Sequence, residues 1–303
     1  MACGSGRAGE KTLEPNMDGH KDVLAEFSHL RDVAVHVARL IANMRVRLRS
    51  SDEVMELEAR LGKLKGKHFD TNVGYAAFCS ILQLLESYPQ WSRVSAWQET
   101  QDVFYTVNLP CEYSSTNGTQ NQIRTSVGVD RQGDIEILHH TKTRLWHVDM
   151  EMRLRDASSC AINITRDADV DSFDARIAAS LEKTIPADLL PIAVTPDFVR
   201  IKQRKRFYLS SLGVDKETFS YDLSIVYSGK TKSEAEQKQS DQQDPCFEVE
   251  VECLQPYEYL ESSGGEDIML ALSLILKCHD FSSALNSSAA VTYVPVQTDT
   301  QFV

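Results

Sequence analysis

Alternation of glutamate with apolar residues is the feature that most limits how this chain can fold. Residues 247–253 read Phe-Glu-Val-Glu-Val-Glu-Cys, and every second side chain of a β-strand points to the same face. The segment therefore predicts a strand with one apolar face and one carboxylate face. Neighbouring acids would lie about 7 Å apart and repel by roughly 2 kcal/mol per pair at an effective dielectric of about 20. A solvated edge strand is one explanation, and a facing row of cations is the other.

The same alternation occurs twice more in the sequence. Residues 55–61 alternate acids with apolar residues and place Glu56 and Glu58 on one face, with a turn expected at Gly62. Residues 200–207 form a basic counterpart, with four cations on one face: Arg200, Lys202, Arg204 and Arg206. A basic surface cluster or a localisation signal is the alternative for this run, but strict alternation favours a strand.

Acidic and basic strands whose charged faces turn toward each other describe a closed sheet. The sequence therefore predicts a β-dominated α+β fold, namely a closed antiparallel β-barrel with a polar, charged interior and a coat of a few helices. Carboxylate oxygens suit Mg²⁺ or Mn²⁺, and arginine and lysine donate to phosphoryl oxygens. Such an interior would clamp a polyphosphate beside a divalent metal ion.

Three stretches, in this order along the chain, resemble a known family. Residues 56–62, 200–204 and 248–252 are similar to the first acidic strand, the Arg-x-Lys-x-Arg strand and the final acidic strand of the metal-dependent RNA 5′-triphosphatases of fungal, protozoan and viral mRNA capping. These enzymes are triphosphate tunnel metalloenzymes. The resemblance implies hydrolysis of the terminal phosphate of triphosphate-ended RNA, the first step of cap formation, with nucleoside triphosphate hydrolysis as a side activity. It also implies Mg²⁺ or Mn²⁺ as cofactor and a capping guanylyltransferase as partner.

Shorter matches lie between these stretches. Arg124, Lys142 and Asp222 resemble single inward residues of the family, and Asp102 resembles an inward aspartate. Where the family often has Arg-Ile-Ser, this chain has Ala-Ile-Asn at residues 161–163, and Asp167 is the candidate for the accompanying acid. The resemblance thus covers residues 52–254 in patches.

Carried over residue by residue, the resemblance implies three kinds of site residue. Glu56, Glu58 and Glu252 would ligate the metal ion. Arg124, Lys202 and Arg204 would hold the terminal phosphate, while Glu250 and Asp222 would position or polarise the attacking water, in keeping with the physics of phosphoryl transfer. Lys142, Arg200 and Glu248 complete the set of expected catalytic residues.

Two other functions stay open on sequence grounds. The same clamp would serve a nucleoside or inorganic triphosphatase, since it recognises a triphosphate whatever is attached to it. A non-catalytic module that binds phosphorylated ends, or a scaffold for a capping partner, is the alternative of another class. The presence of all the expected catalytic roles favours an enzyme.

The remainder of the chain predicts one catalytic domain with helices on its outside. Helices are expected over residues 22–49, 72–87 and 266–279, the first of them packed on the barrel or docking a partner, and further strands over 104–107, 135–138 and 162–165. Residues 1–19 are expected to be disordered and residues 20–287 to form the catalytic domain. Within it, residues 228–245 read as a mobile loop, and residues 288–303 read as a loose tail.

The expected cellular location rests on the net charge, the cysteine content and the hydropathy of the chain. The net charge of −12 over 303 residues argues against broad nucleic-acid binding. Seven cysteines without a Cys-x-x-Cys pair indicate reduced thiols. No apolar signal core opens the chain, and the longest apolar stretch, residues 268–276, is too short to span a bilayer. An intracellular, nuclear location without membrane insertion is therefore expected.

Overall fold

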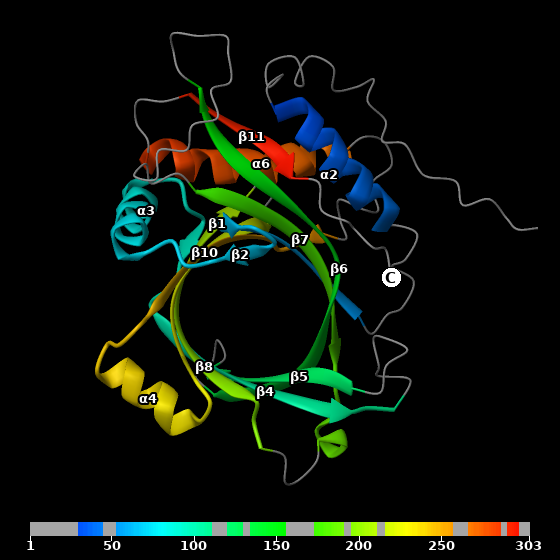
Figure 1. Cartoon of the computed structure of the whole chain (residues 1–303), viewed down its shortest axis with the longest axis vertical. Coiled ribbons are helices and arrows are strands. Elements are labelled where there is room, and N and C mark those ends of the chain that lie inside the picture. Colours follow the sequence, from blue (N-terminus) through cyan, green and yellow to red (C-terminus); the bar gives the residue numbers. More distant parts are fainter. Residues whose placement is uncertain are drawn as a thin grey trace, which may run out of the picture.

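Eight antiparallel strands close on themselves to form a barrel, as the sequence predicts (Figure 1). The computed structural model describes residues 30–44, 53–110, 120–129, 134–155, 173–190, 195–210, 216–256, 266–285 and 290–296. The strands pair in the order β10, β9, β8, β4, β5, β6, β7 and β1, and β1 pairs again with β10. Their bounds are β1 (Glu53–Lys65), β4 (Gln98–Asn108), β5 (Gln120–Val129), β6 (Ile135–Arg155), β7 (Asp174–Thr184), β8 (Phe198–Ser210), β9 (Glu217–Gly229) and β10 (Cys246–Cys253).

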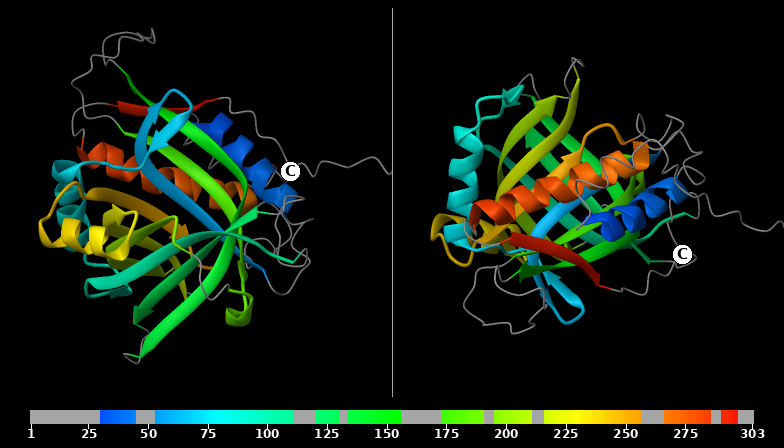
Figure 2. Two further views of the ribbon diagram at one scale, coloured as in Figure 1. Left: turned by 60° about the horizontal axis from the view of Figure 1, so that its bottom comes forward. Right: turned by 90° about the horizontal axis from the view of Figure 1, so that it is seen from above.

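Shorter elements surround this barrel. They are the strands β2 (His68–Asp70), β3 (Arg93–Val94) and β11 (Ala290–Val296), the helices α2 (Arg31–Met44), α3 (Tyr75–Ser87), α4 (Lys232–Ser240) and α6 (Glu266–Leu285), and the 3₁₀ turn η3 (Ala187–Leu189). Helices α2 and α6 lie together against one outer side of the barrel, and α3 lies near the end of α6 that is away from α2 (Figure 2). None of the described helices is both long and apolar enough to cross a membrane.

The main hydrophobic core lies outside the barrel, between its wall and the helices. The apolar residues that alternate with the glutamates of β10, Val249, Val251 and Cys253, pack there with Leu57 and Leu61 of β1. The apolar face of α2 is buried in the same core, so this helix packs on the barrel as expected. Burying each large apolar side chain stabilises the fold by about 1.5–3 kcal/mol. The strands can therefore turn their charged faces inward because their apolar faces are covered from outside.

Local capping sets where α3 begins. The sequence predicts a helix from residue 72, but α3 starts at Tyr75, because Gly74 is its N-cap with φ 79°. The Asn72 side chain accepts a hydrogen bond from the Gly74 N–H instead of opening the helix. The end at Ser87, before Pro89, is as predicted, whereas α6 runs past residue 279 to Leu285.

The segment 228–245 contains a helix where the sequence suggested a mobile loop. Strand β9 continues to Gly229 and α4 follows from Lys232. The Thr231 hydroxyl accepts from the Glu234 N–H, and Glu234 Oε2 accepts from the Lys230 N–H, which is a reciprocal N-terminal cap. Ala235 is fully buried among apolar residues of β4 and β8. Polar composition suggested disorder, but capping and one buried alanine suffice to fix this short helix.

Two further expectations need correction. Residues 290–296 of the expected loose tail form β11, which pairs with β6, because β6 is long enough to offer an edge beyond the barrel. Strand β1 does not turn at Gly62; it continues to Lys65, and the turn falls at Gly66 with φ 64°. A Cβ on Gly62 would lie 2.2 Å from the Asp70 carbonyl oxygen, so glycine is needed there for close packing of β2.

Some predictions lie outside the described residues. These are the disorder of residues 1–19, the strand at 162–165 and the candidate acid Asp167, together with both ends of the helix expected over 22–49. The strands expected at 104–107 and 135–138 are confirmed within β4 and β6. The described cysteines Cys79, Cys246, Cys253 and Cys278 are not joined in disulfides.

Candidate active site

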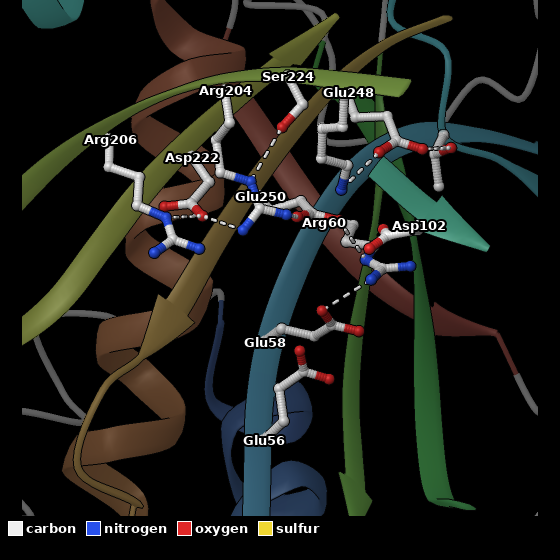
Figure 3. A network of polar contacts seen from close by, with 12 residues as sticks. Glu56, Glu58, Arg60, Asp102, Arg204, Arg206, Asp222, Ser224, Glu248 and Glu250 are labelled. Atoms are coloured by element: carbon white, nitrogen blue, oxygen red, sulfur yellow. Dashed lines mark hydrogen bonds and ion pairs between the residues drawn. The ribbon is translucent and has the colours of Figure 1, made fainter. Parts of the chain in front are cut away.

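The lumen of the barrel carries an acidic wall and a basic wall, and Figure 3 shows hydrogen bonds and ion pairs between residues of the two. Glu58 and Glu252 are direct cross-strand partners, so the acidic rows of β1 and β10 are contiguous. Strand β9 separates β10 from the basic strand β8. The acidic wall consists of Glu56, Glu58, Glu248, Glu250 and Glu252, and the basic wall of Arg200, Lys202, Arg204 and Arg206. The alternation in the sequence thus becomes two opposed charged surfaces.

Glu248 joins the two walls at one end. Its Oε1 lies 2.7 Å from Arg200 Nη2, and its Oε2 lies 3.4 Å from Lys202 Nζ. Burial would raise the pKa of Glu248, but Lys202 and Arg200 outweigh it and lower that pKa. Burial, with Arg204 next to it, lowers the pKa of Lys202. Glu248 therefore orients two cations of the basic wall.

Asp222 of β9 joins the walls further along the lumen. Its Oδ2 lies 2.9 Å from Arg206 Nε and 3.3 Å from Arg204 Nη1. Arg204 Nη2 also lies 4.0 Å from Glu250 Oε2. The second Asp222 oxygen, Oδ1, is buried and has no hydrogen-bond partner among the described residues. This oxygen is therefore a ready acceptor inside the lumen.

Arg60 is a lumen residue that the sequence reasoning missed. Its Nη2 lies 2.8 Å from Glu58 Oε2, and its Nε lies 2.9 Å from Glu250 Oε1. Burial alone would lower the pKa of Arg60. The charges of Glu58 and Glu250 outweigh this effect, so the pKa lies above its ordinary value. The signal was present in the sequence, since Arg60 continues the spacing of Glu56 and Glu58. One guanidinium thereby ties together the two acidic strands.

Lys142 and Arg124 come from the neighbouring wall of β6 and β5. Lys142 Nζ contacts Glu56 Oε2 and lies 3.8 Å from Glu58 Oε1. Arg124 Nη2 lies 2.9 Å from Glu182 Oε1 of β7, and Arg124 Nε donates to His140 Nε2. Glu182 and His140 are further residues that the sequence reasoning did not include.

His140 is a neutral acceptor in this arrangement. Burial, helped by the adjacent Arg124, lowers the pKa of His140 to about 4. Asp102 of β4, expected to point inward, is buried and accepts a 2.6 Å hydrogen bond from Ser126 Oγ. It is the cross-strand partner of Arg200.

The glutamates of the acidic wall differ in protonation. Burial would raise the pKa of Glu250, but Arg60, Lys202 and Arg204 lower it well below its usual range. Burial, followed by the charges of Asp222 and Glu56, raises the pKa of Glu252 to about 8. Burial likewise raises the pKa of Glu58. Burial and neighbouring carboxylates thus disfavour the charged forms of Glu58 and Glu252, whereas nearby cations favour the charged form of Glu250.

The carboxylates of Glu56, Glu58 and Glu252 fit a divalent metal ion in the chemistry of their donor atoms. They offer hard oxygen donors, and the buried Glu58 Oε1 has no hydrogen-bond partner among the described residues. As the side chains stand, no three acidic, histidine or cysteine residues in the described part of the chain converge to hold an ion. Lys142 and Arg60 contact Glu56 and Glu58 instead. Metal binding would therefore require these ion pairs to rearrange.

The lumen opens at two ends. One cavity of about 460 Å³ reaches Arg124, Arg204 and Arg206, and Leu138 lies at its rim; we call this end the Leu138 mouth. A second cavity of about 600 Å³ reaches Arg200 and Glu248 and is bordered by Lys230 and Lys238 beside α4; we call this end the Lys230 mouth. The phosphate-binding candidates Arg124 and Arg204 are thus reached from the Leu138 mouth.

No protein-family model and no curated protein sequence matches the chain. Among solved structures, the S. pombe RNA triphosphatase Pct1 matches with a TM-score of 0.53 at 13% sequence identity, covering 83% of this chain and 92% of that chain. The chain shares its fold with this RNA triphosphatase. The triclinic structure of the Mimivirus capping enzyme triphosphatase is a looser match, with a TM-score of 0.45 at 13% identity over 82% of this chain and 97% of that chain.

The similarity to Pct1 concerns the fold alone. What the lumen of this chain could bind depends on the residues of this chain. Glu56, Glu58, Glu250 and Glu252 face Lys202 and Arg204 across one lumen, whereas Arg124 is held to one side by Glu182. All eleven residues expected from the sequence lie on strands that form the tunnel wall.

Proposed function

We propose that the chain is a metal-dependent triphosphatase that removes the terminal phosphate from the 5′-triphosphate end of RNA, the first step of mRNA capping. One observation carries this proposal. Four cations of β8 face the carboxylates of β1 and β10 inside a closed barrel. Opposed rows of this kind suit a polyanion bound together with a divalent cation. A nuclear location and a capping guanylyltransferase as partner accompany the proposed function.

Glu56, Glu58 and Glu252 would hold Mg²⁺ or Mn²⁺, which when bound would neutralise charge on the phosphoryl oxygens. Burial, with the charges of Asp222 and Glu56, raises the pKa of Glu252 to about 8, and a bound cation would favour the charged form of this carboxyl. Lys142, which contacts Glu56, would then be released toward the phosphates. Lysine and arginine side chains of the chain would thus neutralise part of the phosphate charge together with the metal ion.

Arg124, Lys202 and Arg204 would hold the terminal phosphate. Lys202 is 5% exposed, so an anion that reaches it is shielded from water, and the interaction is stronger than at the surface. Glu248 already keeps Lys202 and Arg200 in place. A phosphate would therefore meet oriented donors, as positioning of the phosphoryl group requires.

Glu250 and Asp222 would orient the attacking water. The pKa of Glu250 is held well below its usual range, which makes it a weak base suited to accepting a hydrogen bond. Asp222 Oδ1 is buried without a hydrogen-bond partner among the described residues, and it would accept the second hydrogen bond. In a loose phosphoryl-transfer transition state, positioning the water contributes more than early proton removal.

A nucleoside or inorganic triphosphatase is the rival function, since the same lumen would accept those substrates. The test measures phosphate release from triphosphate-ended RNA, ATP and tripolyphosphate with Mg²⁺ or Mn²⁺, and with a chelator. We expect release from RNA at the highest kcat/KM and none with the chelator. RNA as the poorest substrate would favour the rival, and binding without release would favour the non-catalytic alternative.

Variants of the acidic wall test the residue assignments. Glu56→Gln and Glu252→Gln should each lower kcat by at least about 100-fold, because each removes one charged ligand for the ion. Glu86→Gln is the matched control, since Glu86 pairs with Lys205 on the outside of the barrel. Unchanged release by both lumen variants would contradict the metal assignment.

A further inference from the structure

The two mouths of the tunnel differ in the side chains that end each row of lumen residues. On β6, Leu138 lies on the same face as His140 and Lys142, because these residues are two and four positions apart. On β1, Val54 precedes Glu56 and Glu58 in the same way. Both rows therefore run from charged residues in the lumen to one apolar residue at the Leu138 mouth.

Neighbouring strands continue this pattern around the Leu138 mouth. Gly128 ends the lumen row of β5 that contains Arg124 and Ser126, and it offers no side chain. Thr184 of β7 and Thr100 of β4 contribute hydroxyl groups to the same cavity. Glu136, at the start of β6, and Arg206, which ends the lumen row of β8, are charged residues that line the same cavity. Apolar, hydroxyl and charged groups thus alternate around this mouth.

The apolar residues at this mouth are open to solvent. Val54 is 61% exposed and Leu138 is 46% exposed, and both line the cavity that reaches Arg124 and Arg204. A single exposed apolar residue needs no explanation. Two of them lie at the entrance to a cavity whose other lining is mostly polar and includes the phosphate-binding candidates Arg124 and Arg204, so apolar contact in this cavity is confined to its mouth.

The Lys230 mouth has a different character. Arg200 is paired with Glu248 at 2.7 Å, and Lys238 is paired with Glu234 at 3.2 Å. Helix α4 borders this mouth and carries the Glu234 and Lys238 side chains. Its charges are thus largely balanced within the protein, and the large apolar residues that are most exposed lie elsewhere.

We infer that the Leu138 mouth binds the nucleoside next to the triphosphate, and that its base contacts Val54 and Leu138 where they line this mouth. The phosphates then extend inward to Arg124 and Arg204. This inference rests on the proposed function and specifies which end of the tunnel its substrate uses. Because Val54 and Leu138 contact the base through apolar groups, the site accepts any of the four bases.

The test compares substrates that have and lack a nucleoside. KM and kcat are measured for triphosphate-ended RNA, ATP and tripolyphosphate with Leu138→Ser and Val54→Ser. We expect the ratio of KM for ATP to KM for tripolyphosphate to rise about tenfold in each variant, and the ratio for RNA to rise likewise, because an apolar contact of this size contributes about that factor.

Two control variants match the test residues. Ile137→Ser removes a 55% exposed apolar side chain that immediately precedes Leu138 and lies on the other face of β6. Lys230→Ser removes a cation from the opposite mouth. Both should leave the substrate ratios as in the wild-type chain. Equal ratios in Leu138→Ser and wild type, or a raised ratio for RNA in Lys230→Ser alone, would overturn the inference.

Binding measurements separate this inference from the proposed function. Dissociation constants for ATP and tripolyphosphate are measured in parallel in the presence of Mg²⁺. If the wild-type chain binds both without releasing phosphate, the proposed hydrolysis fails, and the nucleoside site is judged on the binding ratios of Leu138→Ser. If neither compound binds, both proposals are overturned.

Discussion

Lys142 supplies a positive charge where the metal ion is expected. Its ammonium group contacts Glu56 and lies 3.8 Å from Glu58 Oε1. In the absence of metal this contact limits repulsion between two neighbouring carboxylates, so lysine and metal compete for the same oxygens. We therefore expect Lys142 to have a measurable role in the metal-free protein, in addition to the catalytic role proposed for it.

Lys142→Met should lower the free energy of unfolding by about 2 kcal/mol in the presence of a chelator, because it leaves half-buried carboxylates without their counter-charge. The same variant should gain more stability than the wild type when Mg²⁺ or Mn²⁺ is added. Thermal unfolding with and without metal measures both effects. Lys205→Met is the control, because Lys205 pairs with Glu86 away from the lumen. Equal metal-induced shifts in Lys142→Met and wild type would exclude competition.

His140 should make stability depend on pH in the acidic range. Its pKa of about 4 in the folded state lies below its ordinary value of 6.5, so the folded chain binds fewer protons than the unfolded chain. The resulting stabilisation is complete above pH 6.5 and is lost as the pH falls toward 4, by about 3 kcal/mol at most. Urea unfolding of wild type and His140→Gln should converge over this range. Parallel curves would show that His140 is not buried as a neutral acceptor.

At the scale of elements, the strands that carry the site were predictable and the short helix was not. Strict alternation of charged and apolar residues is typical of a strand and shows which residues share each face. This pattern occurs in residues 55–61, 200–207 and 247–253. The same alternation places Arg60 on the charged face of β1. Its role as an ion-pair partner depends on the pairing of β1 with β10, which brings Glu250 beside it. His140 and Glu182 could not be predicted as site residues. They are single polar residues in strands, and the sequence does not show which residues lie beside them on neighbouring strands.

Helix α4 and strand β11 show the limits of composition. Residues 232–240 are almost wholly polar, yet capping by Thr231 and the burial of Ala235 fix them as a helix. Residues 290–296 pair with the far end of β6, which depends on a long-range edge that no local pattern reveals. Long-range pairing and local capping thus account for the elements that the sequence reasoning missed.

The β1 and β2 hairpin gives a prediction at this scale. Gly62→Ala should lower the free energy of unfolding by about 3 kcal/mol, because the new Cβ would lie 2.2 Å from the Asp70 carbonyl oxygen, which belongs to backbone. Gly66→Ala should cost only about 1 kcal/mol, from its φ of 64° in an otherwise open position. Urea unfolding compares the two variants. A larger loss for Gly66→Ala would contradict the packing of β2 on β1.

At the scale of the whole molecule, the net charge of −12 and the cationic lumen act in opposite directions. The outside of the protein repels nucleic acid, whereas Arg124, Lys202 and Arg204 are offered only inside the tunnel. Binding of triphosphate-ended RNA should therefore depend on few phosphate contacts. This distinguishes the proposed mode from binding along the RNA backbone.

The salt dependence of RNA binding measures that number of contacts. With about three phosphates neutralised, the slope of log K against log salt concentration should be about −2 for a single strand. Fluorescence anisotropy of a labelled RNA with a 5′-triphosphate gives the slope, and the same RNA with a 5′-hydroxyl is the control. A slope of about −6 or steeper for both RNAs would indicate binding along the backbone and contradict end recognition.

Closure of the sheet by the pairing of β1 with β10 has a topological consequence. A ring of eight strands without a gap can be threaded only by the free tip of a polymer, whereas an open groove would accept any stretch of it. If the proposed function holds, selection of RNA ends would follow from the connectivity of the backbone as well as from the chemistry of the triphosphate. A covalently circular RNA would be excluded whatever groups it carried.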